Sequence, residues 1–354
     1  MYLKNIFYGF TFVCVLLATP NCVAGVSSRG VSSEKVYRIA FGSCVHQDKE
    51  QPVWEAVLKD HPDLFIFLGD NIYGDTEDMK VLQEKYDKQN SKPGLSELRK
   101  QTRVIGTWDD HDYGVNDGGA EYPKKEESRQ IMLNFFEEPG DSPRRTQDGG
   151  VYASYMFGEG SEAIRVILLD TRWARSPLIK VPEEELEDRD NRNMGPYVAN
   201  EAPEARMLSE TQWTWLEKQF EGEASLTIIG SSIQFLSDFT GWESWANFPP
   251  EKERLLAVLK KHPETRVMFI SGDMHYAEVS KWDGILPYPL WDFTSSGLTQ
   301  SWHNVSPNLF RVGKSFLEAN YGLMEFQFDP VPRLRFQIKN VFGTVLQSTD
   351  LVLR

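Results

Sequence analysis

The chain contains the stretch ISGDMHYAEVS at residues 270–280, which places Asp273 and His275 two positions apart, directly after the apolar run 267–270. A carboxylate and an imidazole at the end of a buried strand are costly to leave without partners. Their partners are either each other, a substrate or metal ions. The rest of the sequence has to decide between these three.

The same arrangement occurs at three other places, in FGSCVH (residues 41–46), FLGDNIYGD (67–75) and GTWDDHDYGVND (106–117). Each cluster follows an apolar, strand-like run. Any one of them is explained by the preference of Gly, Asp and Asn for turns. Four together, which include Cys44, His111 and His275, indicate a shared site.

Strand-like and helix-like segments alternate along the chain, which predicts an α/β fold with its functional loops at the carboxyl ends of strands. Helical patterns cover residues 51–60, 76–90, 123–138, 210–220 and 251–262, and three β-rich runs lie within 321–353. Residues 172–207 lack clean periodicity. A loop of that length inside a domain is usually functional, and we expect a flap over the site.

The clusters supply two kinds of metal ligand. Hard divalent ions prefer oxygen ligands, which are available from Asp70, Asp110, Asn116 and Asp273. Transition metals bind thiolate, phenolate and imidazole ligands, which are available from Cys44, Tyr73 and His275. Bound cations would also relieve the repulsion between neighbouring carboxylates and hold the thiol deprotonated.

Other hydrolytic and nucleotide-binding signatures are missing from the sequence. No Gly-x-Ser-x-Gly motif precedes a helix, and no Gly-rich nucleotide loop occurs. Two or more close metals can activate a water and hold the attacking and leaving oxygens of a phosphoryl group. Metal-assisted hydrolysis is therefore the reaction that the residues favour.

The ordered motifs FGSC, FLGDNIYGD, TWDDHD and SGDMHY resemble the alkaline phosphatase D (PhoD-like) family, within the calcineurin-like metallophosphoesterase superfamily. The motifs VILLDTR, QWTWLE, IIGSSIQF, ESWANFP and TSSGLTQSW extend the resemblance over nearly all of residues 36–302. It implies a sandwich of two mixed β-sheets flanked by helices. It also implies hydrolysis of phosphate monoesters, diesters or both by a metal-activated hydroxide. The implied cofactors are Fe³⁺ and Ca²⁺, with other divalent metals as alternatives.

The resemblance also implies residue roles. Asp70 would bridge metals, and Cys44, Tyr73 and Asp273 would bind the ferric ion. Neighbouring calcium-type sites would use Asn116 and His275.

Further roles follow from the run at residues 109–112. Asp110 occupies the position at which the superfamily has an asparagine metal ligand, and Asp109 is the alternative for this role. His111 occupies the position of the superfamily's catalytic histidine. Two departures concern Asp112, where glutamate is more frequent, and Gln300, where many relatives have histidine.

Arg172 ends the strand-like segment 163–172 and has two interpretations. It binds the substrate phosphate, or it forms a structural ion pair with Asp170 or with the acidic loop that follows.

The first residues have the layout of a secretory signal peptide. Lys4 precedes an apolar run at 6–18, and Pro20 is followed by a small-residue cleavage site at 22–24. We expect a signal peptide at 1–24, a flexible leader at 25–35 and the PhoD-like domain at 36–354. An uncleaved N-terminal anchor is the alternative. After cleavage the protein would be secreted or periplasmic, without a membrane span, and Cys44 would be its lone cysteine.

The formal net charge of −14 describes an acidic protein. Such a surface repels nucleic acid, so we expect no nucleic-acid partner. The resemblance implies a phosphate-ester substrate, and we expect a monomer. The rival function is a non-catalytic secreted protein that holds phosphate or a glycan at the same metal site. His111 favours the enzyme, because binding alone requires no proton donor.

Overall fold

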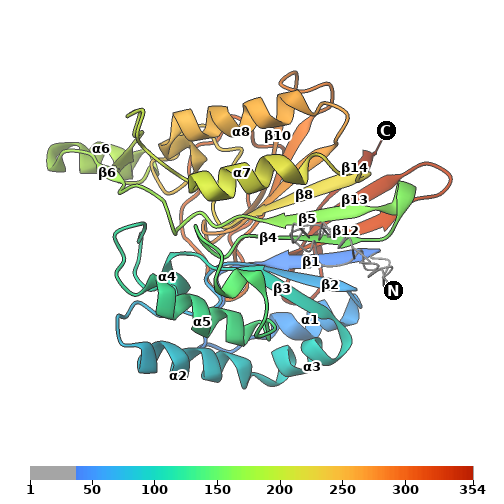
Figure 1. Ribbon diagram of the computed structural model, residues 1–354, viewed down its shortest axis with the longest axis horizontal. Helices are drawn as coiled ribbons and strands as arrows, with labels where there is room; N and C mark the ends of the chain where they lie inside the picture. The colour runs from blue at the N-terminus through green and yellow to red at the C-terminus, as the bar shows by residue number, and fades with distance from the viewer. Residues whose placement is uncertain (1–36, 354) are drawn as a thin grey trace, which may run out of the picture. The chain divides into compact units, whose positions relative to one another are not determined.

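The computed structural model describes residues 37–353, whose strands form two six-stranded sheets and one two-stranded ribbon (Figure 1). The strands of the first sheet are β1 (Arg38–Gly42), β2 (Leu64–Leu68), β3 (Arg103–Thr107), β12 (Asn320–Gln327), β13 (Arg333–Asn340) and β14 (Val345–Val352). The strands of the second sheet are β4 (Ala153–Phe157), β5 (Ile164–Leu168), β8 (Leu226–Ser231), β9 (Val267–Ser271), β10 (Ala277–Trp282) and β11 (Leu290–Ser295).

Both sheets are mixed. The first has the order β14-β13-β12-β1-β2-β3, with β1, β2 and β3 parallel and the other neighbours antiparallel. The second has the order β10-β11-β9-β8-β5-β4, with β11, β9, β8 and β5 parallel and both edge pairs antiparallel. Parallel strands bring their carboxyl ends to one edge of a sheet, which is where polar loops converge.

The two sheets pack face to face, and helices cover their outer faces (Figure 1). The first sheet is covered by α1 (Val53–Lys59), α2 (Met79–Asn90), α3 (Pro93–Gln101) and α5 (Lys125–Phe135). The second is covered by α7 (Glu210–Gln219) and α8 (Pro249–Lys261). The expected sandwich of two mixed sheets flanked by helices is confirmed.

β2 shows why its sequence is apolar throughout. Its residues Leu64, Ile66 and Leu68 point into the core between the sheets. The alternate residues Phe65 and Phe67 point into the core under the helices. Because successive side chains of a strand point to opposite faces, a strand buried on both sides reads as an unbroken hydrophobic run.

The helix expected at 210–220 begins as the sequence indicates. The Ser209 side chain accepts a hydrogen bond from the backbone N–H of Gln212 at 3.1 Å, which satisfies one of the free donors of the first turn. In contrast, the pattern did not predict α3, β4, β10 or β11. α3 is longer than α1, and the three strands are no shorter than β1, so length is not the reason. In β10 and β11, buried polar residues such as Glu278 and Asp292 interrupt the hydrophobic period.

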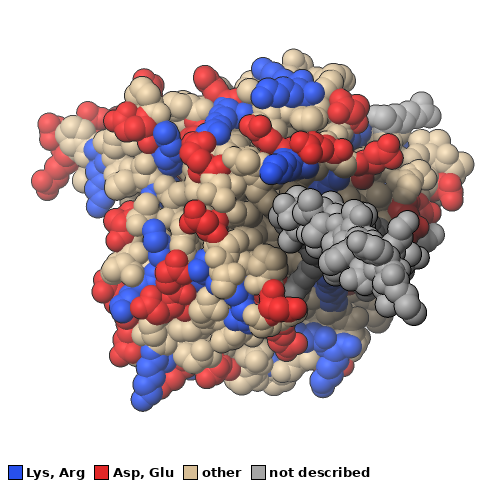
Figure 2. All heavy atoms as spheres, viewed as in Figure 1, with Lys and Arg blue, Asp and Glu red and all other residues tan. Residues whose placement is uncertain are grey.

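The segment 172–207 contains β6 (Ile179–Lys180), α6 (Leu186–Asn191) and β7 (Tyr197–Val198), and its last part reaches the site described below. On the face shown in Figure 2, acidic and basic side chains are mixed, and acidic ones crowd the end of the molecule that carries α6.

The expected signal peptide and leader lie outside the described residues. Within residues 37–353, none of the helices has both the length and the apolar composition needed to cross a bilayer.

Candidate metal centre

The four polar clusters meet at one edge of the sandwich. Cys44, Asp70, Asp109 and Asp273 each stand two residues beyond the end of a strand, after β1, β2, β3 and β9 respectively. Because β9 belongs to the second sheet, the site joins loops from both sheets. The sequence could place each cluster at a strand end, and the structure brings the four ends together.

Within residues 37–353, four groups of three side chains are close enough to share a cation. They are Cys44–Asp70–His275, Asp70–Asp110–His111, Asp109–Asp110–Asp273 and Asp110–Asp117–Glu243. Within each group the ligand atoms lie within 4.8 Å of one another. Asp70 and Asp110 belong to more than one group, so neighbouring cations would share them.

The backbone around the site is strained at several of these residues. Cys44, Asp70, Asp273 and His275 have positive φ angles of 62°, 48°, 70° and 56°. This conformation costs a residue other than glycine roughly 1 kcal/mol and is concentrated at functional sites. Position 69 requires glycine on two grounds. Its φ is 99°, which glycine adopts without strain, and an added Cβ would lie 2.4 Å from Cβ of Asp109.

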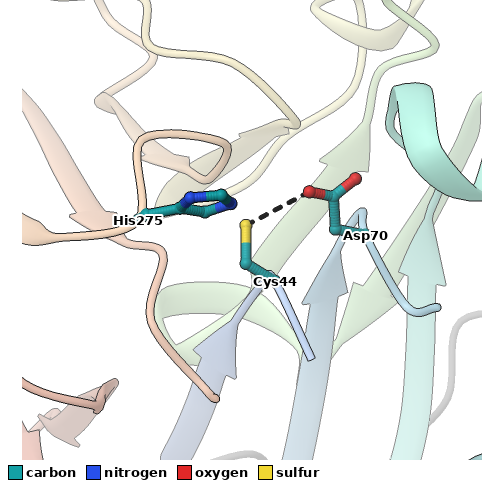
Figure 3. A group of neighbouring side chains, drawn as sticks. All are labelled: Cys44, Asp70 and His275. Atoms are coloured by element: carbon teal, nitrogen blue, oxygen red, sulfur yellow. Dashed lines mark hydrogen bonds between the residues drawn. The ribbon is translucent and has the colours of Figure 1, made fainter. Parts of the chain in front are cut away.

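Cys44, Asp70 and His275 point toward one another from three separate loops (Figure 3). The buried thiol of Cys44 donates to Oδ2 of Asp70 at 3.4 Å, and its sulfur lies 3.2 Å from Oγ of Ser296. Burial raises the pKa of Cys44 to about 12. Its thiolate therefore requires a cation beside the sulfur.

Tyr73 and His275 form the next contact. The Tyr73 hydroxyl lies 3.0 Å from Nε2 of His275, and burial raises the pKa of Tyr73 well above its ordinary value. Burial, together with the positive charges of His111 and Lys49, lowers the pKa of His275 to about 4. The imidazole is thus neutral at neutral pH, which is the form that binds metals.

His111 lies on the short helix α4 (Asp110–Tyr113) and is held by a second carboxylate that the sequence did not single out. Its Nδ1 is 2.8 Å from Oδ1 of Asp75, and its backbone N–H donates to Oδ1 of Asp110 at 2.8 Å. Burial opposes the imidazolium, but Asp70, Asp110 and Asp75 outweigh it and raise the pKa of His111 to about 10. The contact with Asp75 leaves Nε2 as the nitrogen free to act on a substrate.

Asp109 and Asp110 have different surroundings although they are adjacent. Oδ1 of Asp109 accepts from Nε of Arg172 at 2.6 Å, whereas Oδ2 of Asp110 accepts from the backbone N–H of Asp117 at 2.7 Å. Burial raises the pKa of Asp109 to about 8. Burial acts in the same direction on Asp110, but Arg172 and His111 lower its pKa to about 2. Asp110 is therefore the more strongly anionic of the two.

Arg172 is fully buried and paired to carboxylates on two sides. Its Nη1 donates to Oε1 of Glu243 at 2.8 Å, in addition to the contact with Asp109. The ion-pair partners are thus Asp109 and Glu243. The carboxylate of Asp170 accepts the backbone N–H of Arg172 at 2.9 Å, as well as those of Trp173 and Val151, but not the guanidinium. This burial places the guanidinium beneath the carboxylates, where it fixes their orientation.

Asn116 is exposed, and its neighbour Asp117 is the residue that turns inward. The Tyr197 hydroxyl donates to Oδ2 of Asp117, so β7 of the 172–207 segment reaches this side of the centre. The residues that the sequence did not assign, Asp75, Asp117 and Glu243, carry one common signal. Each is acidic and lies in a stretch already quoted, Asp75 and Glu243 in motifs of the resemblance and Asp117 in the cluster 106–117.

Asp112 joins the segments that follow β2 and β3 below the ligands. Its carboxylate accepts the backbone N–H groups of Asp109 at 2.6 Å, Asp70 at 3.2 Å and Asn71 at 3.2 Å. At this departure from the expected glutamate, the shorter side chain makes hydrogen bonds that hold Asp70 and Asp109 in place.

The residues fit metal ions. Oδ1 of Asp70 and Oδ2 of Asp109 are buried and have no hydrogen-bond donor within residues 37–353. A buried carboxylate oxygen without a donor is expensive, and a cation satisfies it. The soft donors around Cys44 and the oxygens around Asp110 match a transition metal beside a hard divalent ion.

Solved structures with the same fold confirm the architecture. The structure of PhoD is 16% identical, with a TM-score of 0.63 over 90% of this chain and 73% of that one. The purple acid phosphatase PPD1 from yellow lupin (Lupinus luteus) seeds is 12% identical, with a TM-score of 0.60 over 90% of this chain and 54% of that one. GAP50, described as the anchor in the inner membrane complex of Plasmodium, is 14% identical, with a TM-score of 0.57 over 91% and 90%.

At these identities the similarities show the fold alone. A comparison with curated protein sequences found no match. The family model described as PhoD-like phosphatase matches residues 39–346, which include all four strand-end clusters. The chain therefore belongs to the PhoD-like phosphatase family.

Proposed function

We propose that the protein is a metal-dependent phosphoesterase that hydrolyses phosphate monoesters, diesters or both. One observation carries the proposal. The ligand groups around Asp70 and Asp110 overlap, and His111 stands directly beside them. This arrangement combines a place for close cations with a group that can donate a proton.

The proposed iron ligands are Cys44, Tyr73, Asp70 and Asp273. The neighbouring calcium-type sites would use Asp70, Asp110, Asn116 and His275, with a change of side-chain conformation at the exposed Asn116. When bound, the metals would supply Lewis acidity and an activated water. Fe³⁺ and Ca²⁺ are the proposed ions because thiolate and phenolate ligands favour the first and carboxylate oxygens the second.

His111 would protonate the leaving oxygen of the ester. Asp75 holds Nδ1, so Nε2 is the nitrogen that would act on the ester. Asp75, which is not a proposed metal ligand, favours the protonated ring, and this ring would supply the proton that the leaving alcohol needs. Arg172 would act only through Asp109, as a positioning residue.

Export is part of the proposal. The signal-peptide pattern at residues 1–24 supports a secreted or periplasmic enzyme, and a metal-bound thiolate at Cys44 would be protected from oxidation there.

The enzyme should hydrolyse p-nitrophenyl phosphate, its bis-ester or both, optimally at alkaline pH, after loading with iron and calcium. The measurement is release of p-nitrophenol, with metal content determined on the same sample. No turnover of either substrate by protein whose metals are confirmed would favour the rival function, a secreted phosphate- or glycan-binding protein.

Replacing Cys44 by alanine should lower iron occupancy and activity together. If the thiolate is a ligand, its loss removes one iron donor, and the charge-transfer colour expected from ferric thiolate and phenolate should fade. The measurements are iron content, visible absorption and kcat. If Cys44 is instead a small buried core residue, the variant keeps its iron and activity.

Ser296→Ala is the matched control for this test. It removes the hydroxyl 3.2 Å from Sγ and disturbs the same pocket without removing the sulfur. We expect it to retain iron. A colourless, fully active enzyme whose Cys44→Ala variant keeps its metals contradicts the assignment.

A further inference from the structure

Trp302 lies at the rim of the candidate metal centre and is left 43% exposed. Its ring centroid is 5.9 Å from that of His275, and its backbone N–H donates to the carbonyl of His275 at 3.0 Å. A tryptophan fixed to a proposed ligand residue but open to solvent presents an apolar surface beside the reacting group. Exposed aromatic surface next to a polar centre is typical of a ligand-binding site.

The segment that carries Trp302 is fixed to a second ligand loop as well. Leu298 donates its backbone N–H to the carbonyl of Ser43 at 3.1 Å, and Thr299 donates to that of Cys44 at 3.1 Å. The side chain of Thr299 in turn accepts from the backbone N–H of His46 at 2.7 Å. These contacts hold Trp302 at a set distance from the centre, so binding against it requires little ordering.

Trp242 adds a second aromatic wall. Its ring meets that of Trp302 edge to face, with centroids 5.6 Å apart and planes at 73°. Its segment is joined to the 172–207 region through the carbonyl of Gly241, which accepts from Tyr197 at 3.0 Å. This edge-to-face contact supports the ring of Trp302 from one side and fixes its orientation at the rim.

Lys49 provides a positive charge on the same rim. Its ammonium group donates to Oε1 of Gln300 and lies 3.5 Å from the carbonyl of Thr299. In a protein with a net charge of −14, a cation beside the centre attracts an anionic substrate locally. The rim therefore offers a cation for phosphate and aromatic rings for the group attached to it.

We propose that Trp302, supported by Trp242, determines specificity by stacking on a planar aromatic group of the phosphate ester. This inference rests on the proposed phosphoesterase function and deepens it, because it names the substrate class. The aromatic group is that of a phenolic ester or the base of a nucleotide.

Non-hydrolysable ligands test the inference without requiring turnover. Phenylphosphonate and cyclohexylphosphonate share the anionic group and have rings of similar size, but only the first ring is flat. Binding to the metal-loaded protein is measured by calorimetry. We expect the wild type to prefer phenylphosphonate, and Trp302→Ala to lose about tenfold in affinity for it while its affinity for cyclohexylphosphonate changes little.

Two further variants complete the design. Trp302→Phe retains a ring and should recover most of the affinity for phenylphosphonate. Trp215→Ala removes a partly buried tryptophan that lies on α7 and contacts the ring of Tyr152, so it should leave both affinities unchanged. Metal content is measured for every variant, because Trp302 also contacts His275.

A third ligand separates the two sources of the aromatic group. The methylenephosphonate analogue of adenosine 5′-monophosphate places a ribose between base and phosphonate. We compare the loss of affinity in Trp302→Ala for this nucleotide analogue and for phenylphosphonate. The ligand with the larger loss has the distance between ring and phosphonate that the site prefers, and either result supports stacking.

An equal loss for the flat and the puckered ring overturns the inference, because Trp302 would then be an apolar wall or a support for His275. No loss in Trp302→Ala overturns it too, as does failure of the wild type to bind phenylphosphonate. Selective aromatic binding without hydrolysis of any ester would instead refute the proposed function and leave the stacking role intact.

Discussion

Asp70→Asn is expected to lower phosphoesterase activity by a factor of about 10³ or more, since Asp70 belongs to two of the ligand groups. Asparagine preserves the shape but removes the negative charge and one acceptor oxygen. Oδ1 of Asp70 has no donor among residues 37–353, so its proposed role is to bind cations. Metal content should fall together with kcat, by loss of at least one ion per chain.

Asp292→Asn is the matched control for Asp70→Asn. Asp292 is equally buried and accepts backbone N–H groups from Phe235 and Leu236, both at 2.8 Å, but it belongs to none of the candidate ligand groups. Its variant should lose stability and keep its metals. If Asp70→Asn retains full metal content and activity within tenfold of wild type, the proposed bridging role is wrong.

Removal of the metals should make the stability of the protein fall steeply as the pH rises from about 5 to 8. In the metal-free site, burial is the main cause that raises the pKa of Asp70 and Asp273 well above the ordinary value, and that of Asp109 to about 8. Metal binding would lower these pKa values again, because the cations compensate the negative charge of the buried carboxylates. Chelated and metal-loaded protein should therefore differ most at alkaline pH.

The sign follows from proton binding. A carboxyl whose pKa is raised by folding keeps its proton in the folded state at a pH where the unfolded chain, with a pKa near 4, has released it. The folded state then holds more protons, so stability falls with increasing pH across this window. His111, with its pKa raised to about 10, acts in the same direction, and its contribution is lost as the pH rises through that value. Asp110, with a pKa of about 2, is charged throughout and does not change the slope.

Each group that keeps its proton contributes about 1.4 kcal/mol per pH unit, so a single group would lower the stability by about 4 kcal/mol between pH 5 and 8, and we expect a loss of at least that size. The measurement is the free energy of unfolding in urea, for chelated and metal-loaded protein at each pH. Metal-free Asp70→Asn should show a shallower decline, since it lacks one of the titrating groups. Parallel curves for the chelated and loaded protein would mean that the buried carboxylates do not need cations.

The sequence by itself determined the α/β class and the location of the candidate site, whereas the sandwich of two sheets was implied by the resemblance of its motifs to the family. The apolar runs of β1, β2, β3 and β9 each end in a polar cluster, and residue type within these clusters indicated metal ligands. Both features depend on neighbours in the chain, where hydrophobic period and turn preference act directly. The family match over residues 39–346 agrees with the same motifs.

Only the tertiary structure decided which side chains meet. The contacts of His111 with Asp75, of Arg172 with Asp109 and Glu243, and of Trp302 with His275 and Trp242 join residues that are far apart in the chain or in separate motifs. Such pairings depend on how loops from two sheets converge. No local sequence pattern encodes the distance between side chains on different loops. The same convergence buries several carboxylates together and thereby sets their charge states, which residue type alone leaves open.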